Sequence, residues 1–308
     1  MTVDQGHVDF GYFYGNVSRT IKTPGWIMSG RFLGRGGAVR WMLGTVALAA
    51  LGTLPALANV VTTASWDDLK PAIYGSRIIH DGKGMVTLHA PYRADDQRTV
   101  PISASVTLTE GRKLKSVTFI VDEDPVPVAA VFHLDGKRER IAIGANLRLN
   151  GPSPVRVVVE DSQGELYMSE ALVKVSGLGA CASPPITDQE IASKNLGRMN
   201  FADVTELSHG AQATSVSHRA RLEIQHPNNS GMQMNQITLL YIPARYIESV
   251  QISQGDTRVL DMEGSISLAE NPVVEFDYRM GGTGPFEVVA KDSDGTLFQH
   301  KFEILQGF

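Results

Sequence analysis

The sequence has little cysteine, few aromatic residues and no strong excess of positive charge. A single cysteine among 308 residues excludes an intrachain disulfide and a cysteine-rich zinc site. Asp and Glu number 33 against 28 Lys and Arg, a net charge of −5 that argues against binding to nucleic acid or to anionic lipid. The 43% hydrophobic content is nevertheless that of a folded protein, and the length suits two domains.

Motifs of common enzymes are also missing from the sequence. We find no H-E-x-x-H, no G-x-S-x-G, no Walker A motif and no Rossmann glycine pattern. The glycine-rich stretch at 281–285 is typical of a hairpin turn. The acidic stretch at 122–124 offers few ligands for a cation, so a solvated strand end is favoured there. The sequence therefore predicts a protein that is not an enzyme and holds no metal and no cofactor.

The first 58 residues have the pattern of an export signal. Three arginines at 31, 35 and 40 precede an uncharged stretch, Trp41–Ala58, which ends in Ala56-Leu57-Ala58. This order of positive charge, apolar core and small residues predicts a Sec-type signal peptide cleaved after Ala58, with Met28 as a plausible true start. A short membrane anchor is the alternative, but the stretch is Ala/Gly-rich and carries Pro55. We expect a periplasmic protein with no membrane contact after cleavage.

Two strand-rich blocks follow the signal region. Alternating and β-branched runs separated by Gly, Asn and Asp turns predict an all-β fold of two sandwiches. In the first block the predicted strands are 85–90, 101–109, 114–121, 129–134, 139–149, 155–161 and 166–175. In the second they are 219–226, 236–241, 248–253, 258–262, 273–278, 286–291 and 297–305. The hairpins at 157–167 and 288–298 share a D-S-x-G turn, which indicates two sandwiches of related design.

Two segments outside the strands have helix signals. Ser65-Trp66-Asp67-Asp68 predicts the capped start of a short helix before the first block. Thr187-Asp188-Gln189-Glu190 is a capping box, which predicts one or two helical turns that stop near Gly197. The second segment lies in a polar linker, 182–212, for which disorder is the alternative.

Cys181 is the most distinctive residue of the chain. Small residues surround it, namely Gly177, Gly179, Ala180 and Ala182. Such neighbours offer little surface to bury a side chain, so we predict a thin, exposed arm that enters another protein's cleft. No Lys, Arg or His lies nearby in sequence, which predicts a thiol pKa near the free value of roughly 8.5. That value suits a covalent carrier better than an enzyme nucleophile, and an incidental exposed cysteine is the alternative.

Several short motifs stand out in the two blocks. The first block contains Leu88-His89-Ala90-Pro91, Val100-Pro101, Ile120–Pro127 leading to Phe132, and Cys181. The second block contains His226-Pro227, Ser230-Gly231-Met232, Ile242–Ile247 and Asn271-Pro272. By these motifs and their order along the chain, the first block resembles SoxY and the second resembles SoxZ, the two subunits of a periplasmic sulfur-oxidation carrier.

This resemblance implies two immunoglobulin-like β-sandwiches that pack against each other within one chain. The SoxY-like domain would span 59–181, the partly helical linker 182–212 and the SoxZ-like domain 213–308. Cys181 would hold a sulfur-containing intermediate covalently while Sox-type or quinoprotein dehydrogenase enzymes act on it. In SoxY the cysteine lies in Gly-Gly-Cys-Gly-Gly at a free C-terminus, whereas here the chain continues past it.

Two other functions compete with the carrier hypothesis. The first is a non-covalent adaptor for a periplasmic quinoprotein dehydrogenase, in which Cys181 is incidental. The second is a thiol-dependent enzyme, which is disfavoured because no general base is visible beside Cys181 in the sequence.

Overall fold

A computed structural model describes residues 66–109, 111–177, 179–205, 217–279 and 284–303. The predicted signal region therefore lies outside the described residues, as does most of the glycine-rich stretch at 281–285. The fold is all-β, as the sequence predicts. Within the described ranges, no helix combines the length and the apolar character needed to cross a membrane.

Most of the described elements are β-strands, with a few short helices between them. The first half contains α1 (Trp66–Tyr74), β1 (Ile79–Asp81), β2 (Val86–His89), β3 (Val100–Thr107), β4 (Leu114–Val121), β5 (Val128–His133), β6 (Arg140–Leu147), β7 (Ser153–Asp161), β8 (Leu166–Val173) and the 3₁₀ turn η1 (Ala180–Ala182). The second half contains α2 (Gln189–Asn195), β9 (Met199–Asp203), β10 (Ser217–Ile224), β11 (Ile247–Gln254), β12 (Thr257–Gly264), β13 (Val273–Arg279), β14 (Phe286–Asp292) and β15 (Leu297–Phe302).

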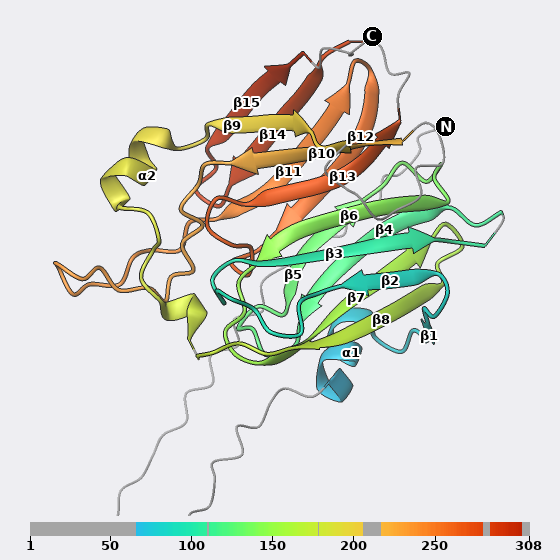
Figure 1. The fold of residues 1–308 in the computed structure, drawn as a ribbon, viewed down its shortest axis with the longest axis horizontal. Helices are drawn as coiled ribbons and strands as arrows, with labels where there is room; N and C mark the ends of the chain where they lie inside the picture. Colours follow the sequence, from blue (N-terminus) through green and yellow to red (C-terminus); the bar gives the residue numbers. More distant parts are fainter. Residues whose placement is uncertain (1–65, 110, 178, 206–216, 280–283, 304–308) are drawn as a thin grey trace, which may run out of the picture. The chain divides into compact units, whose positions relative to one another are not determined.

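The strands form two sheets, and each sheet continues from the first half of the chain into the second (Figure 1). The larger sheet has the order β1-β8-β7-β4-β5-β12-β11-β14-β15, and the smaller has the order β2-β3-β6-β13-β10-β9. The two halves meet through the antiparallel pairs β5–β12 and β6–β13. The strand orders on either side of these joins mirror each other, so the two halves are related by an approximate two-fold axis.

One hydrophobic core runs through both halves. The side chains between the sheets include Phe119 and Phe132 from the first half and Phe276 and Phe286 from the second, all with no exposed surface. The aromatic rings of Phe119 and Phe132 meet edge to face with centroids 5.4 Å apart. A shared core together with continuous sheets pairs the two halves, as the resemblance implies.

The repeated hairpin turns have the same internal structure. Asp161 closes the β7–β8 turn, where its Oδ1 accepts hydrogen bonds from the N–H groups of Gln163 and Glu165. Asp292 closes the β14–β15 turn in the same way through the N–H groups of Asp294 and Thr296. Each aspartate also pairs with an arginine, Arg112 in the first half and Arg245 in the second. The sequence repeat therefore reflects a structural repeat of the two sandwiches.

The linker is partly helical and partly strand. Asp188 caps α2 by accepting hydrogen bonds from the N–H groups of Glu190 and Ile191, so the N-cap is Asp188 rather than Thr187. The helix ends before Gly197, which has a left-handed φ of 78°. Strand β9 then pairs with β10 as the edge strand of the smaller sheet.

One predicted strand, 236–241, is wrong. These residues belong to a long loop between β10 and β11, which extends away from both sheets in Figure 1. Ile237, Leu239 and Leu240 imitate the apolar content of a strand, but all three side chains are exposed to solvent. Sequence patterning also missed the short strands β1 and β9.

Candidate functional site

Cys181 lies in the 3₁₀ turn η1, which follows β8, and it is fully buried. The prediction of an exposed arm is therefore wrong for Cys181 and for its neighbour Ala180, because both are buried. The turn begins at Gly179, whose φ of 77° is one that a side chain would disfavour. Gly177 and Ala182 are exposed, so the small residues allow the backbone to turn inward rather than extend outward.

Hydrogen bonds hold the segment against the first half of the chain. Gly177 N donates to Gln97 Oε1 at 3.2 Å, and Gly179 N donates to Asn150 O at 2.7 Å. Cys181 N donates to Asn150 Oδ1 at 3.3 Å. Asn150 thus holds the turn at two points, Gly179 with its main chain and Cys181 with its side chain.

The second half of the chain covers the cysteine from the other side. Ser230 Oγ donates a hydrogen bond to the carbonyl oxygen of Cys181. Glu270 holds the chain just after the cysteine, because it accepts hydrogen bonds from Ile186 N at 2.7 Å and from Thr187 N at 2.8 Å. We call residues 179–187 the strap, because both halves of the chain fasten it. Cys181 is therefore enclosed between the two sandwiches.

Two buried charged groups lie near the thiol, one of each sign. Arg148 is 2% exposed and donates hydrogen bonds to the backbone carbonyls of Asn228 and Ile266. Asp124 is 5% exposed, and burial raises its pKa to about 7. Its Oδ1 accepts a hydrogen bond from Asn150 N, whereas no described residue donates one to its buried Oδ2. Asn150 thus contacts both the aspartate and the cysteine.

The environment makes the thiol unreactive in this conformation. Burial is the main cause that raises the pKa of Cys181 to about 12, and the carboxylate of Asp124 adds to the effect. The positive charge of Arg148 opposes the shift but does not cancel it. The pKa predicted from sequence, near 8.5, is therefore wrong, because it considered sequence neighbours and ignored burial.

A narrow crevice runs beside the strap. Its lining includes Arg98, Arg148, Ala180, Gln233 and Glu270. The crevice is too narrow to hold a water molecule. Access to the thiol therefore requires the strap or the loops over it to move.

Comparison with protein families separates the chain into the same two halves. The profile of the sulfur oxidation protein SoxY matches residues 70–181, and that of the sulphur oxidation protein SoxZ matches residues 208–303. The chain belongs to the SoxY and SoxZ families, fused in one polypeptide. These are families of sulfur-oxidation carrier proteins, which fits the prediction that the chain is not an enzyme. The SoxY match ends at Cys181, and the strap fastens this residue to the SoxZ domain.

Known structures give weaker likenesses. The sulfur carrier SoxY from Chlorobium limicola f thiosulfatophilum is 22% identical over 35% of this chain and 90% of its own, with a TM-score of 0.30. A superoxide reductase from Ignicoccus hospitalis is 10% identical over 37% of this chain and 90% of its own, with a TM-score of 0.25. Comparison with curated protein sequences gives no match. None of these findings concerns a quinoprotein dehydrogenase, so that partner stays a prediction.

The other sequence candidates have structural roles. The acidic stretch is not a solvated strand end, because Asp122 is buried in an ion pair with Arg156. Arg156 Nη2 lies 2.9 Å from Asp122 Oδ2. His226 is buried beside Asp292, and burial lowers its pKa to about 4. Among the described residues, no three His, Cys, Asp or Glu side chains gather as metal ligands would.

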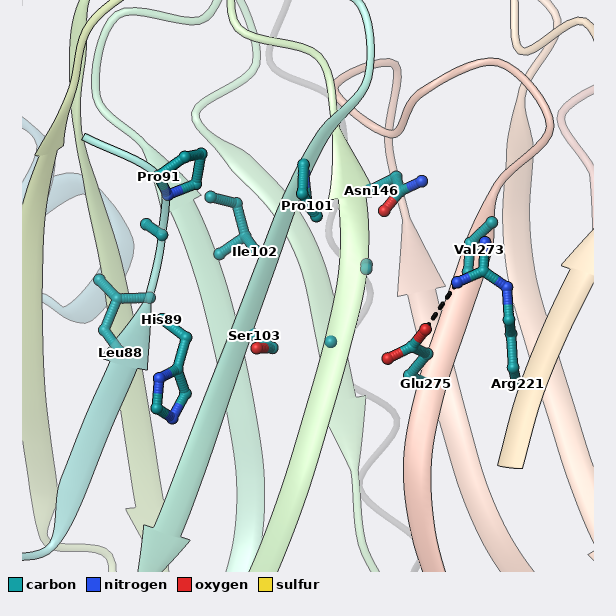
Figure 2. A pocket seen from close by; sticks show the side chains of 13 residues that line it. Leu88, His89, Pro91, Pro101, Ile102, Ser103, Asn146, Arg221, Val273 and Glu275 are labelled. Atoms are coloured by element: carbon teal, nitrogen blue, oxygen red, sulfur yellow. Dashed lines mark hydrogen bonds and ion pairs between the residues drawn. The ribbon is translucent and has the colours of Figure 1, made fainter. Parts of the chain in front are cut away.

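A second, open cavity lies on the outer face of the smaller sheet (Figure 2). It has a volume of about 570 Å³. SoxY-like motif residues from two strands line it, including His89 and Pro101, and across the domain join it is lined by Arg221 and Glu275. Arg221 and Glu275 form an ion pair at 2.6 Å, and His89 contacts Ser105 Oγ at 3.1 Å. The charged groups in this groove are thus already paired, and it lies apart from the cysteine.

Sequence reasoning identified Cys181 but missed the groups that enclose it. Asp124, Arg148, Ser230 and Glu270 come from four separate segments, and only the fold brings them together. One signal was available, since Arg148 lies between the apolar residues Leu147 and Leu149 at the end of a predicted strand. A charged residue in such a buried run indicates a polar site.

Proposed function

We propose that this protein is a periplasmic carrier that holds a sulfur-containing intermediate as a covalent adduct on Cys181. The single observation that carries the proposal is the position of this cysteine. It is the chain's one cysteine, it ends the SoxY domain, and residues of the SoxZ domain cover it. A cysteine that served only to fill a core would have no need to lie at the junction of two domains.

The carrier then has a closed and an open state. In the closed state the pKa of about 12 leaves almost no thiolate, which protects an unpaired cysteine from oxidation. In the open state the strap leaves the interface, and water restores an ordinary thiol pKa. Joining the thiol to a reduced sulfur compound forms a sulfur–sulfur bond and releases the thiol proton and two electrons. The partner oxidation enzyme supplies the acceptor for those electrons.

Replacement of the cysteine tests the proposal. Cys181→Ala and Cys181→Ser should both abolish thiosulfate oxidation in a strain that lacks the natural chain. Because the site is buried, Cys181→Ser should also lower the free energy of unfolding by about 1–3 kcal/mol, more than an exposed arm would predict. Cys181→Ala leaves no buried hydroxyl and is the variant in which folding and function are best separated.

A second function, a non-covalent adaptor, is favoured by the burial itself, since inert cysteines are normally buried. Intact mass of protein isolated from its own compartment separates the two. A discrete adduct on Cys181 supports the carrier. A free thiol, together with full oxidation activity of Cys181→Ala, overturns the carrier in favour of the adaptor.

Export is part of the proposal and has its own test. The pattern of Trp41–Ala58 supports removal of a signal peptide after Ala58. N-terminal sequencing of protein from the periplasmic fraction should begin at Asn59. Protein that begins well before this residue, or that stays in the cytoplasm, would contradict it.

A further inference from the structure

The loop between β10 and β11 has a buried base and an exposed apolar tip. At the base, Ser230 and Gln233 are almost fully buried beside the strap. At the tip, Ile237 is 92% exposed, and Leu239, Leu240 and Tyr241 are each about two-thirds exposed. Large apolar side chains that gather in this way on a soluble protein indicate a surface that contacts another molecule. We call Ile237, Leu239, Leu240 and Tyr241 the apolar tip.

The tip is ordered before anything binds to it. Asn235 Oδ1 accepts hydrogen bonds from the N–H groups of Ile237 and Thr238, both at 2.9 Å. In the main chain, Asn235 N donates a hydrogen bond to Leu240 O, and Leu239 N donates one to Asn235 O, both at 2.9 Å. Leu239 adopts a left-handed φ of 57°, which is rare for a bulky residue and is typical of constrained functional sites. A rigid tip loses little conformational entropy on binding.

The base and the tip form one hydrogen-bonded unit. Bridges join Asn229 to Arg245 and Met234 to Tyr241, and Ile242 N donates to Gln233 O at 2.8 Å. The unit begins beside Ser230, whose hydroxyl contacts the carbonyl oxygen of Cys181. Anything seated on the tip is therefore connected, through a short and rigid loop, to the residue that covers the cysteine.

The chemistry of the tip defines its partner. Residues 229–244 contain no Asp, Glu, Lys or Arg, although a fifth of the whole chain is charged. A charged surface would be a poor match for such a loop, and an uncharged apolar depression would be a good one.

We infer that the apolar tip is the docking element for the oxidation enzyme that acts on Cys181. That enzyme would offer an uncharged apolar depression beside its active site. The inference rests on the proposed function, because the argument for this occupant is that the tip is continuous with the covered cysteine. A second copy of the chain and a lipid surface have no such relation to Cys181, and they serve as alternative outcomes of the test.

Matched substitutions test the inference in the full chain. Ile237→Asp and Leu240→Asp place a carboxylate in the apolar contact, and Ile78→Asp does the same at a side chain of the SoxY domain that is 71% exposed. Two rates are measured in a strain that lacks the natural chain. The first is the rate at which Cys181 gains an adduct, followed by intact mass, and the second is the rate of thiosulfate-dependent oxygen uptake. Circular dichroism and the free-thiol count in denaturant show that each variant is folded and intact.

Burial of one such side chain corresponds to a roughly ten- to hundredfold change in binding. We therefore expect Ile237→Asp and Leu240→Asp to slow loading about tenfold or more at limiting partner concentration, and Ile78→Asp to leave it unchanged. Asn235→Ala, which loosens the tip without removing an apolar group, should give a smaller loss. Normal loading in both tip variants overturns the inference.

Two further measurements separate the alternative occupants. Sedimentation of the natural chain and of Ile237→Asp tests self-association, and flotation with phosphatidylcholine vesicles tests lipid binding. Tip-dependent dimers or tip-dependent flotation would overturn the enzyme as the occupant. If Cys181 never carries an adduct, the proposed function fails, and oxygen uptake by the tip variants still decides whether the tip docks an oxidation enzyme.

Discussion

Release of the strap should control how fast Cys181 reacts. The perturbation is Glu270→Ala, which removes the two hydrogen bonds that the carboxylate accepts from Ile186 N and Thr187 N. A hydrogen bond to a charged group contributes roughly 1.5–3 kcal/mol, so the pair stabilises the closed strap by about 3 kcal/mol at the low end. That corresponds to about a hundredfold in the opening equilibrium. Ser230→Ala removes the neutral hydrogen bond from this hydroxyl to the strap, besides the one it accepts from Met232 N within its own loop. The lost bond to the strap should raise the opening equilibrium about fivefold.

The assay is the rate at which a small disulfide reagent labels the thiol at pH 8. A thiol of pKa about 12 has over a thousandfold less thiolate at this pH than one at the free value of roughly 8.5, so the closed state reacts very slowly. Labelling then proceeds from the open state, and its rate scales with the opening equilibrium when reclosing is fast. Glu270→Ala should raise the rate about a hundredfold while the midpoint of global unfolding remains far above the assay temperature.

A matched control removes a carboxylate elsewhere. Glu248 forms an exposed ion pair with Lys291 at 2.9 Å, and its replacement by alanine should leave labelling unchanged. Two results would refute the reasoning. The natural chain would label as fast as a free thiol, or Glu270→Ala would label no faster than the natural chain.

Two further predictions concern buried charges. Burial raises the pKa of Asp124 to about 7, so its contribution to stability is full below about pH 4 and is lost as the pH rises to about 7. Asp124→Asn should flatten this part of the stability profile in urea unfolding, and an unchanged slope between pH 4 and pH 7 would contradict it. Arg156→Met should cost about 3–5 kcal/mol, because it leaves the buried carboxylate of Asp122 unpaired and removes the guanidinium 4.4 Å from the Trp66 ring. Adding Asp122→Leu should recover much of that loss in the same unfolding measurement.

Local patterns predicted most of the fold because they report burial within one element. Strand β3 alternates between buried residues such as Ile102 and more exposed ones such as Ser103, and the period of two is visible in the sequence. The resemblance supplied the pairing of the two sandwiches. Nothing in a linear pattern distinguishes the apolar run at 236–241 from a strand, because exposure depends on what packs against it. Strand β9 was missed because it lies within the polar linker 182–212 and becomes a strand only by pairing with β10.

The sequence predicted the cysteine of the candidate site but not the residues that bury it, because burial depends on contacts between distant segments. Cys181 stands out in a chain with one cysteine, so its position could be chosen from composition. Its burial depends on Ser230 and Glu270, which lie 49 and 89 residues after it in the sequence. Both reach the strap only through the join of the two domains. Small neighbours were taken to mean exposure, whereas they allow the tight turn that places the thiol inside.

Fusion changes how such a carrier can deliver its cysteine. The strap is continuous with β8 on one side and with α2 and β9 on the other, so Cys181 cannot leave as the tip of a free tail. If the strap opens while Gly177 stays anchored to Gln97, four residues separate the cysteine from its anchor, and a fully extended chain spans about 14 Å. A loop fixed at both ends reaches less far than this limit. The partner must therefore bring its active site close to the domain junction, which is the position that docking on the apolar tip would give it. A shorter reach thus places a greater demand on the docking surface, and the rigid loop over Cys181 is the element of the SoxZ domain best placed to meet it.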